Sequence, residues 1–103
     1  MPRPDRMRMP LAMAFLVMHA LSPQAEPRRS TVEECAACHG IDGIARDTEV
    51  PHLAGQNERY LYNQMMAFRS GKRVHKEMRY MARAMSVAEI AAVSAYYAAL
   101  PPR

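Results

Sequence analysis

The stretch Cys35-Ala36-Ala37-Cys38-His39-Gly40 decides how the rest of this sequence is interpreted. Two cysteines three positions apart, followed at once by a histidine, form the C-x-x-C-H pattern that is typical of covalent c-type haem attachment. The two thiols can add across the two vinyl groups of a haem, because one turn of helix brings both sulfurs to the same porphyrin edge. His39 then falls beneath the iron, where its imidazole can be an axial ligand.

Two other chemistries use the same residue types. In a thioredoxin-like protein the cysteines would be a redox-active dithiol, which is expected after a strand of a βαβ unit, and no strand pattern precedes Cys35. In a structural zinc site, two of three histidines (His39, His52 and His75) would join the cysteines. However, the adjacent Cys38 and His39 are awkward tetrahedral partners, and the histidines lack finger-like spacing. The haem interpretation is therefore favoured over both.

The first 25 residues have the pattern of a secretory signal peptide. Three arginines within the first eight residues give a positive start, and the apolar run 11–18 follows. This run is too short to span a bilayer as a helix, which takes about 20 apolar residues. We expect cleavage after Ala25, which releases a soluble domain of residues 26–103 into the periplasm. Without cleavage, the segment would anchor the chain to the membrane.

The charge pattern excludes one class of partner and leaves another open. The chain has 103 residues and a formal net charge of +4, and from residue 26 onward eleven Lys and Arg stand against nine Asp and Glu. This domain has no basic run with interleaved aromatic residues, so nucleic acid is not an expected partner. Six cations gather between residues 69 and 83: Arg69, Lys72, Arg73, Lys76, Arg79 and Arg83. They form either an ordinary solvated face or a docking surface for an acidic redox partner.

Helix signals predict an all-α domain with three helices. The first begins with an N-cap at Ser30 or Thr31 and ends at Gly40. The second runs from Gln56 or Asn57 to a C-cap at Gly71. The third begins at a capping box formed by Ser86 and Glu89 and stops before Pro101 and Pro102.

Two long segments between these helices, 41–55 and 72–85, are predicted to be irregular. Loops of this length are unusual in so small a domain unless they cover a cofactor. The domain also lacks tryptophan and has few aromatic residues, and chains of this size usually need a staple such as disulfides, a metal or another large apolar centre. A haem would supply that centre.

Several blocks, in order and at suitable spacing, resemble class I bacterial cytochromes c, most closely one haem domain of the cytochrome c4 and c553-type group. The resemblance covers residues 35–100. It rests on Cys-Ala-Ala-Cys-His-Gly at 35–40, Pro-His-Leu-Ala-Gly-Gln at 51–56, Phe-Arg-Ser-Gly-Lys-Arg at 68–73, Met78-x-x-Met81-Ala82, Ser86-x-x-Glu89-Ile90 and Tyr96-Tyr97-Ala98-x-Leu100. Together these blocks are far more specific than C-x-x-C-H alone.

The resemblance implies a small class I cytochrome c fold, with three main helices and long loops wrapped round one covalently bound haem c. Cys35 and Cys38 would carry the thioether bonds, and His39 would be the proximal iron ligand. The Pro51 carbonyl would hold the second ring nitrogen of His39. Met78 matches the position of the distal ligand, with Met81, one turn onward, as the alternative.

Other residues receive more ordinary roles. Met85 stands where relatives usually have leucine, which predicts core packing. His52 and His75 are interpreted as loop histidines, although iron ligation by two histidines through His75 is a conceivable departure from the family pattern.

The same resemblance implies a function. It predicts a periplasmic monohaem cytochrome that carries one electron at a time between redox proteins, acidic or membrane-bound, and that is not an enzyme and has no small-molecule substrate. One alternative is the electron-transfer subunit of a larger dehydrogenase complex. Another, of a different class, is a haem enzyme or gas sensor with an open axial site, which requires that neither methionine binds the iron.

Overall fold

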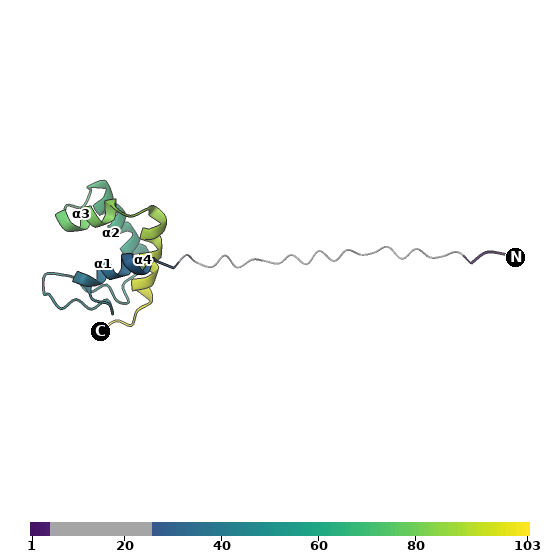
Figure 1. Cartoon of the computed structure of the whole chain (residues 1–103), viewed down its shortest axis with the longest axis horizontal. Coiled ribbons are helices and arrows are strands. Elements are labelled where there is room, and N and C mark those ends of the chain that lie inside the picture. The colour runs from purple at the N-terminus through teal and green to yellow at the C-terminus, as the bar shows by residue number, and fades with distance from the viewer. Residues whose placement is uncertain (5–25) are drawn as a thin grey trace.

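Four α-helices form the regular structure of the residues that the computed structural model describes, 1–4 and 26–103. In order they are α1 (Arg29–His39), α2 (Glu58–Ser70), α3 (Lys76–Arg83) and α4 (Val87–Ala99) (Figure 1). The all-α fold class is confirmed. The expectation of three helices needs one correction, because the segment 72–85, predicted to be irregular, contains α3. The predicted signal peptide falls almost wholly on residues outside the described ranges.

The start of α1 differs from the prediction. The helix begins at Arg29, so Ser30 and Thr31 lie inside it, and the N-cap residue Arg28 makes no side-chain hydrogen bond to the helix. Thr31 is buried, which removes its hydroxyl from a capping role. Arg28 forms an ion pair with Glu89 of α4, with a distance of 3.0 Å between guanidinium nitrogen and carboxylate oxygen. The beginning of α1 is therefore linked to α4 by a tertiary contact and not by a local cap.

The ends of α2 and α4 follow the sequence signals closely. The Asn57 side chain accepts a hydrogen bond from the Tyr60 backbone N–H at 2.9 Å and caps α2. Gly71 ends α2 with a left-handed backbone (φ 85°) that glycine adopts without steric cost. Ser86 Oγ accepts a hydrogen bond from the Glu89 N–H at 3.1 Å and begins α4. These three predictions are confirmed.

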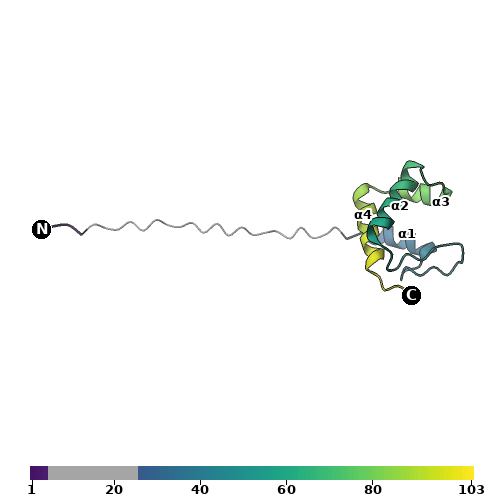
Figure 2. The ribbon, with the colours of Figure 1, turned by 180° about the vertical axis from the view of Figure 1, so that it is seen from behind.

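The hydrophobic core lies where α2 and α4 pack against each other, and α3 packs on α2 (Figure 2). Its buried cluster consists of Leu61, Met85, Ile90, Val93 and Tyr97. Met85 is buried, which confirms the packing role that the sequence predicts for it. One helix turn of α1 reaches this cluster through its first cysteine, which is half-buried against it. The C-x-x-C-H motif is thus joined directly to the core.

The helix α3 has one apolar and one polar face. Positions three and four apart lie on the same side of a helix. Met78 and Met81 are half-buried and Ala82 is fully buried, whereas Arg79 and Tyr80 are exposed. The helix therefore presents its two methionines to the protein and its basic residues to solvent.

The segment between α1 and α2 folds back on itself at Gly43. The Gly43 carbonyl oxygen accepts hydrogen bonds from the N–H groups of Leu53 at 2.8 Å and Ala54 at 3.1 Å. Gly43 has a positive φ of 72°, and a Cβ there would lie 2.8 Å from the Ala54 nitrogen, so the close approach requires glycine. Gly55 N–H then donates to the Tyr97 carbonyl at 3.1 Å, which joins the segment to α4. None of the helices in the described ranges is long and apolar enough to cross a membrane.

Candidate functional site

Both cysteines and the histidine of the motif lie at the C-terminal end of α1. Cys35 is half-buried and Cys38 is exposed, and the two thiols are not joined in a disulfide. His39, the last residue of the helix, is only 8% exposed. Gly40 follows with φ 84° and ψ 148°, a backbone region essentially restricted to glycine, so the chain turns away immediately after the histidine. The sequence motif therefore becomes a compact group of three functional side chains on one helical end.

A hydrogen bond fixes the imidazole of His39. Its Nδ1 lies 2.9 Å from the carbonyl oxygen of Pro51, twelve residues onward. A carbonyl oxygen only accepts hydrogen bonds, so Nδ1 carries the proton and Nε2 keeps the lone pair that a metal requires. This is the contact that the family resemblance implies for Pro51. It orients the ring before any ligand is bound.

The electrostatics of Cys35 do not suit a redox-active dithiol. Burial, together with a smaller effect of the neighbouring Glu34 carboxylate, raises the pKa of the Cys35 thiol from its ordinary 9.0 to about 11. Reactive cysteines need the opposite shift, because the thiolate is the nucleophile. An inert, half-buried thiol is instead compatible with permanent covalent linkage to a cofactor.

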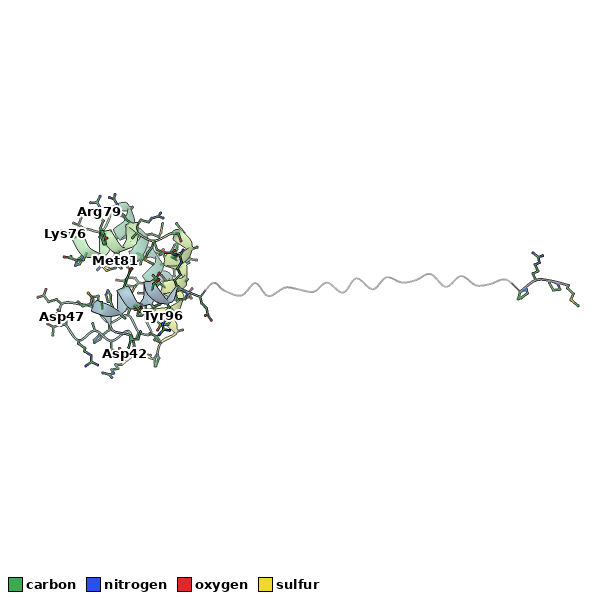
Figure 3. All side chains as sticks on the ribbon, viewed as in Figure 1. Asp42, Asp47, Lys76, Arg79, Met81 and Tyr96 are labelled. Atoms are coloured by element: carbon green, nitrogen blue, oxygen red, sulfur yellow. The ribbon has the colours of Figure 1, made fainter. Side chains whose placement is uncertain are left out.

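The two candidate distal ligands lie on α3. Figure 3 shows Met81 on the side of this helix that faces α1, whereas Lys76 and Arg79 extend from the other side. Met78 is three residues before Met81 on the same helix, and both side chains are half-buried. The helix thus offers two thioether sulfurs, one turn apart, on its protein-facing side. No contact separates their roles, and the assignment of Met78 stays a prediction.

The other two histidines of interest use their Nδ1 atoms within the protein. His52 Nδ1 accepts a hydrogen bond from the Ala45 N–H at 2.9 Å. His75 Nδ1 accepts one from the Met78 N–H at 3.2 Å and so caps α3. Both histidines therefore stabilise local backbone structure, and His75 positions the helix that carries the methionines.

The residues present fit a haem. The helix α1 carries two free thiols, which can attach a haem, and an oriented imidazole, which can bind its iron. The helix α3 carries methionine sulfurs, and histidine with methionine is the ligand pair of cytochromes c. Large apolar side chains that contact the core cluster are only partly buried, as a bulky apolar cofactor requires: Leu53, Tyr62, Met65 and Met66.

Comparison with known proteins agrees with this geometry. The family model described as Cytochrome c matches residues 28–100. The cytochrome c4 of Pseudomonas aeruginosa is 44% identical over 64 residues, which are 62% of this chain and 32% of that protein. A thiosulfate dehydrogenase electron acceptor of Stutzerimonas stutzeri is 43% identical over 70 residues, which are 65% of this chain and 32% of that protein. In three dimensions, the cytochrome c4 structure of Acidithiobacillus ferrooxidans aligns with a TM-score of 0.61 and 38% identity, over 64% of this chain and 38% of that one.

The all-helical fold and the C-x-x-C-H helix define a small c-type haem protein, and this chain belongs to the cytochrome c family. Its cofactor is haem c. The chain spans about a third of the length of these two curated relatives.

Sequence reasoning included Tyr97 of α4 in the family resemblance but gave it no role at the site. Its side chain is 2% exposed, and its hydroxyl oxygen is buried without a hydrogen-bond partner in the part of the chain that the structure describes. The available signal was a tyrosine, and not phenylalanine or leucine, on the buried face of an amphipathic helix, because a buried phenol normally needs a partner.

Proposed function

We propose that this protein is a monohaem c-type cytochrome that carries one electron at a time between redox proteins. The bound haem supplies a reversible one-electron iron couple. Cys35 and Cys38 hold it covalently, His39 is the proximal ligand and Met78, with Met81 as the alternative, is the distal ligand. The observation that carries the proposal is the 2.9 Å contact between His39 Nδ1 and the Pro51 carbonyl, which leaves Nε2 available for a metal at the end of a C-x-x-C-H helix.

The ligand set favours a carrier over an enzyme. His39 and one of the two methionines would both bind the haem iron, and this pair of ligands raises the reduction potential. Substrate or gas binding would need an iron that lacks one of these two protein ligands. The enzyme or sensor alternative therefore requires that both Met78 and Met81 stay off the iron.

The experiment that tests this function is a redox titration of the haem-loaded protein, followed by exposure of the ferrous form to carbon monoxide. A carrier gives a single reversible one-electron wave and an unchanged ferrous spectrum in carbon monoxide. Rapid formation of a carbon monoxide complex, together with turnover of hydrogen peroxide, would instead establish the open-site alternative.

The polar face of α3 has the charge and shape expected of a docking surface for an acidic redox partner. Four of the six clustered cations, Arg73, Lys76, Arg79 and Arg83, line one groove of about 640 Å³ beside α3. The groove also includes Val74 and Tyr80, large apolar side chains that are 91% and 75% exposed. Basic residues that surround exposed apolar groups suit a partner segment that is acidic and partly apolar. We assign the docking role to this groove.

Charge reversal tests the docking surface. The double variant Lys76→Glu, Arg79→Glu should bind an oligoglutamate peptide much more weakly than the wild type at low salt, and the difference should vanish at high salt. The matched control is the double variant Arg46→Glu, Arg59→Glu, which reverses two exposed cations outside the groove and changes the net charge by the same amount. Equal losses in the two double variants would show that only net charge matters, and would remove the docking role.

A second candidate function is to accept electrons from a dehydrogenase, either as a free carrier or as a subunit of its complex. The relative named a thiosulfate dehydrogenase electron acceptor, at 43% identity, favours it. The test is reduction of the ferric protein by a thiosulfate dehydrogenase in the presence of thiosulfate. Rapid reduction that needs both components supports the role, and equal reduction by thiosulfate alone contradicts it.

The proposed location is the periplasm, on the basis of the signal pattern in residues 1–25. Fractionation of cells should recover the haem protein in the periplasmic extract, with an N-terminus at residue 26. Recovery with the membranes and an intact N-terminus would indicate an uncleaved anchor.

A further inference from the structure

The hydroxyl of Tyr97 is a buried polar group without a partner. The residue lies on the inner side of α4 and is 2% exposed, and its oxygen makes no hydrogen bond within the described ranges. Leaving such a donor unpaired in a protein interior is unfavourable, because the hydroxyl loses its hydrogen bonds to water and gains none in return. A tyrosine at this position therefore needs an acceptor that none of the described residues supplies.

Two other hydroxyl groups on the same helix have partners, one on a buried residue and one on a half-buried residue. Ser94, also 2% exposed, donates its hydroxyl to the Ile90 carbonyl at 2.7 Å. The adjacent Tyr96 donates to the Ile41 carbonyl at 3.4 Å. The rings of Tyr96 and Tyr97 meet edge to face, 5.1 Å apart and at 88°. The two neighbouring tyrosines thus differ: the Tyr96 hydroxyl donates to a backbone carbonyl, whereas the Tyr97 hydroxyl has no acceptor among the described residues.

The residues around Tyr97 indicate that its hydroxyl lies on the side of the attachment cysteine Cys35. The cluster around it is apolar, with Leu61, Met85, Ile90 and Val93 as its buried members. Cys35 packs against this same cluster from α1. Burial raises the pKa of Tyr97, and the Cys35 thiol and the Tyr96 phenol raise it further, which agrees with a phenol close to the attachment cysteine. The hydroxyl remains protonated and is available as a hydrogen-bond donor.

We propose that the Tyr97 hydroxyl donates a hydrogen bond to the haem group that Cys35 holds, either at the thioether sulfur or at the porphyrin itself. This inference rests on the proposed haem attachment. A thioether sulfur has lone pairs and the porphyrin ring has an electron-rich π face, so both can accept a hydrogen bond and neither donates one. The donor also places the positive end of the O–H dipole toward the haem. It therefore stabilises the reduced form, which carries one more electron, relative to the oxidised form.

The test compares Tyr97→Phe with Tyr96→Phe in the haem-loaded protein. Each variant removes one oxygen from neighbouring rings of the same helix, so packing is nearly preserved in both. Tyr97→Phe should favour the oxidised form by three- to tenfold, and a tenfold change corresponds to about 59 mV for a one-electron couple. Tyr96→Phe, whose oxygen bonds to backbone, should leave the potential close to that of the wild type.

A second measurement does not depend on a stable variant. In the wild type, exchange from H2O into D2O should shift haem or carbon–sulfur vibrational bands in the resonance Raman spectrum, because the donated proton exchanges. The shift should persist in Tyr96→Phe and vanish in Tyr97→Phe. An unchanged potential in Tyr97→Phe, or wild-type bands that ignore deuterium, would overturn the role of Tyr97 and leave the carrier function intact. A wild-type protein without covalent haem would overturn the proposed function first, together with this inference.

Discussion

The two helices that carry the candidate iron ligands are positioned by different means. On α1, His39 is buried and hydrogen-bonded to Pro51, and Cys35 packs on the core. On α3, Met78 and Met81 are half-buried to a similar degree on one face of a two-turn helix. The α1 side therefore has one geometry set by tertiary contacts, whereas the α3 side offers two equivalent ligands. A long-range hydrogen bond and burial therefore fix the ligand position on α1, whereas neither singles out one of the two methionines on α3.

The largest expected effect concerns the attachment residues of α1. The double variant Cys35→Ala, Cys38→Ala should carry no covalent haem, because no other cysteine is present in the sequence. Acidified organic solvent should extract any residual haem from this variant and none from the wild type or from Met81→Ala. Extraction of the haem from the wild type would show that the two thiols do not form thioether bonds.

The two glycines that end α1 and α2 give the next test. Gly40→Ala should cost about 3 kcal/mol of unfolding free energy, since its backbone region excludes other residues and the new Cβ would collide with the Ile44 carbonyl. Gly71→Ala should cost only about 1 kcal/mol, because its left-handed backbone is strained for alanine but the new Cβ would meet only the Arg79 guanidinium, at an ordinary contact distance of 3.8 Å. Denaturant unfolding of both variants measures the difference. Equal losses of unfolding free energy in the two variants would contradict the conclusion that the end of α1 is more closely packed than the end of α2.

A smaller effect is expected at the start of α3. His75→Ala removes the side chain that accepts the Met78 N–H and should lower the unfolding free energy by about 1 kcal/mol. His75→Asn should restore most of this, because asparagine is a strong N-cap. Ser86→Ala, at the cap of α4, is the matched control with a similar loss. A change in the iron ligand spectrum in His75→Ala but not in Ser86→Ala would show that the cap also positions the methionines.

The sequence predicted the elements whose signals are local. Asn57, Gly71 and Ser86 act within one helical turn of their own position, and each does what its residue type indicates. Gly40 ends α1 for the same reason. By contrast, Ser30 and Thr31 fail as caps because Thr31 is buried and the helix starts earlier, next to the ion pair of Arg28 with α4.

The helix α3 escaped prediction because it is short and has an unusual cap. It has only eight residues and its N-cap is a histidine, and a helical period is recognised over a window of about 11 to 18 residues. Long-range contacts are equally invisible. The contact of His39 with Pro51 followed from the family resemblance alone, and the unpaired hydroxyl of Tyr97 depends on the cluster of side chains that buries it.

The most direct test of the whole site is the near-infrared edge of the visible spectrum of the ferric protein, where a methionine-to-iron charge-transfer band reports sulfur ligation. Our account predicts this band in the wild type, its loss in Met78→Ala and its retention in Met81→Ala. Loss of the band in Met81→Ala alone would assign the distal ligand to Met81, one turn further along α3. A wild-type protein without the band would contradict the central claim that α1 and α3 together coordinate the iron.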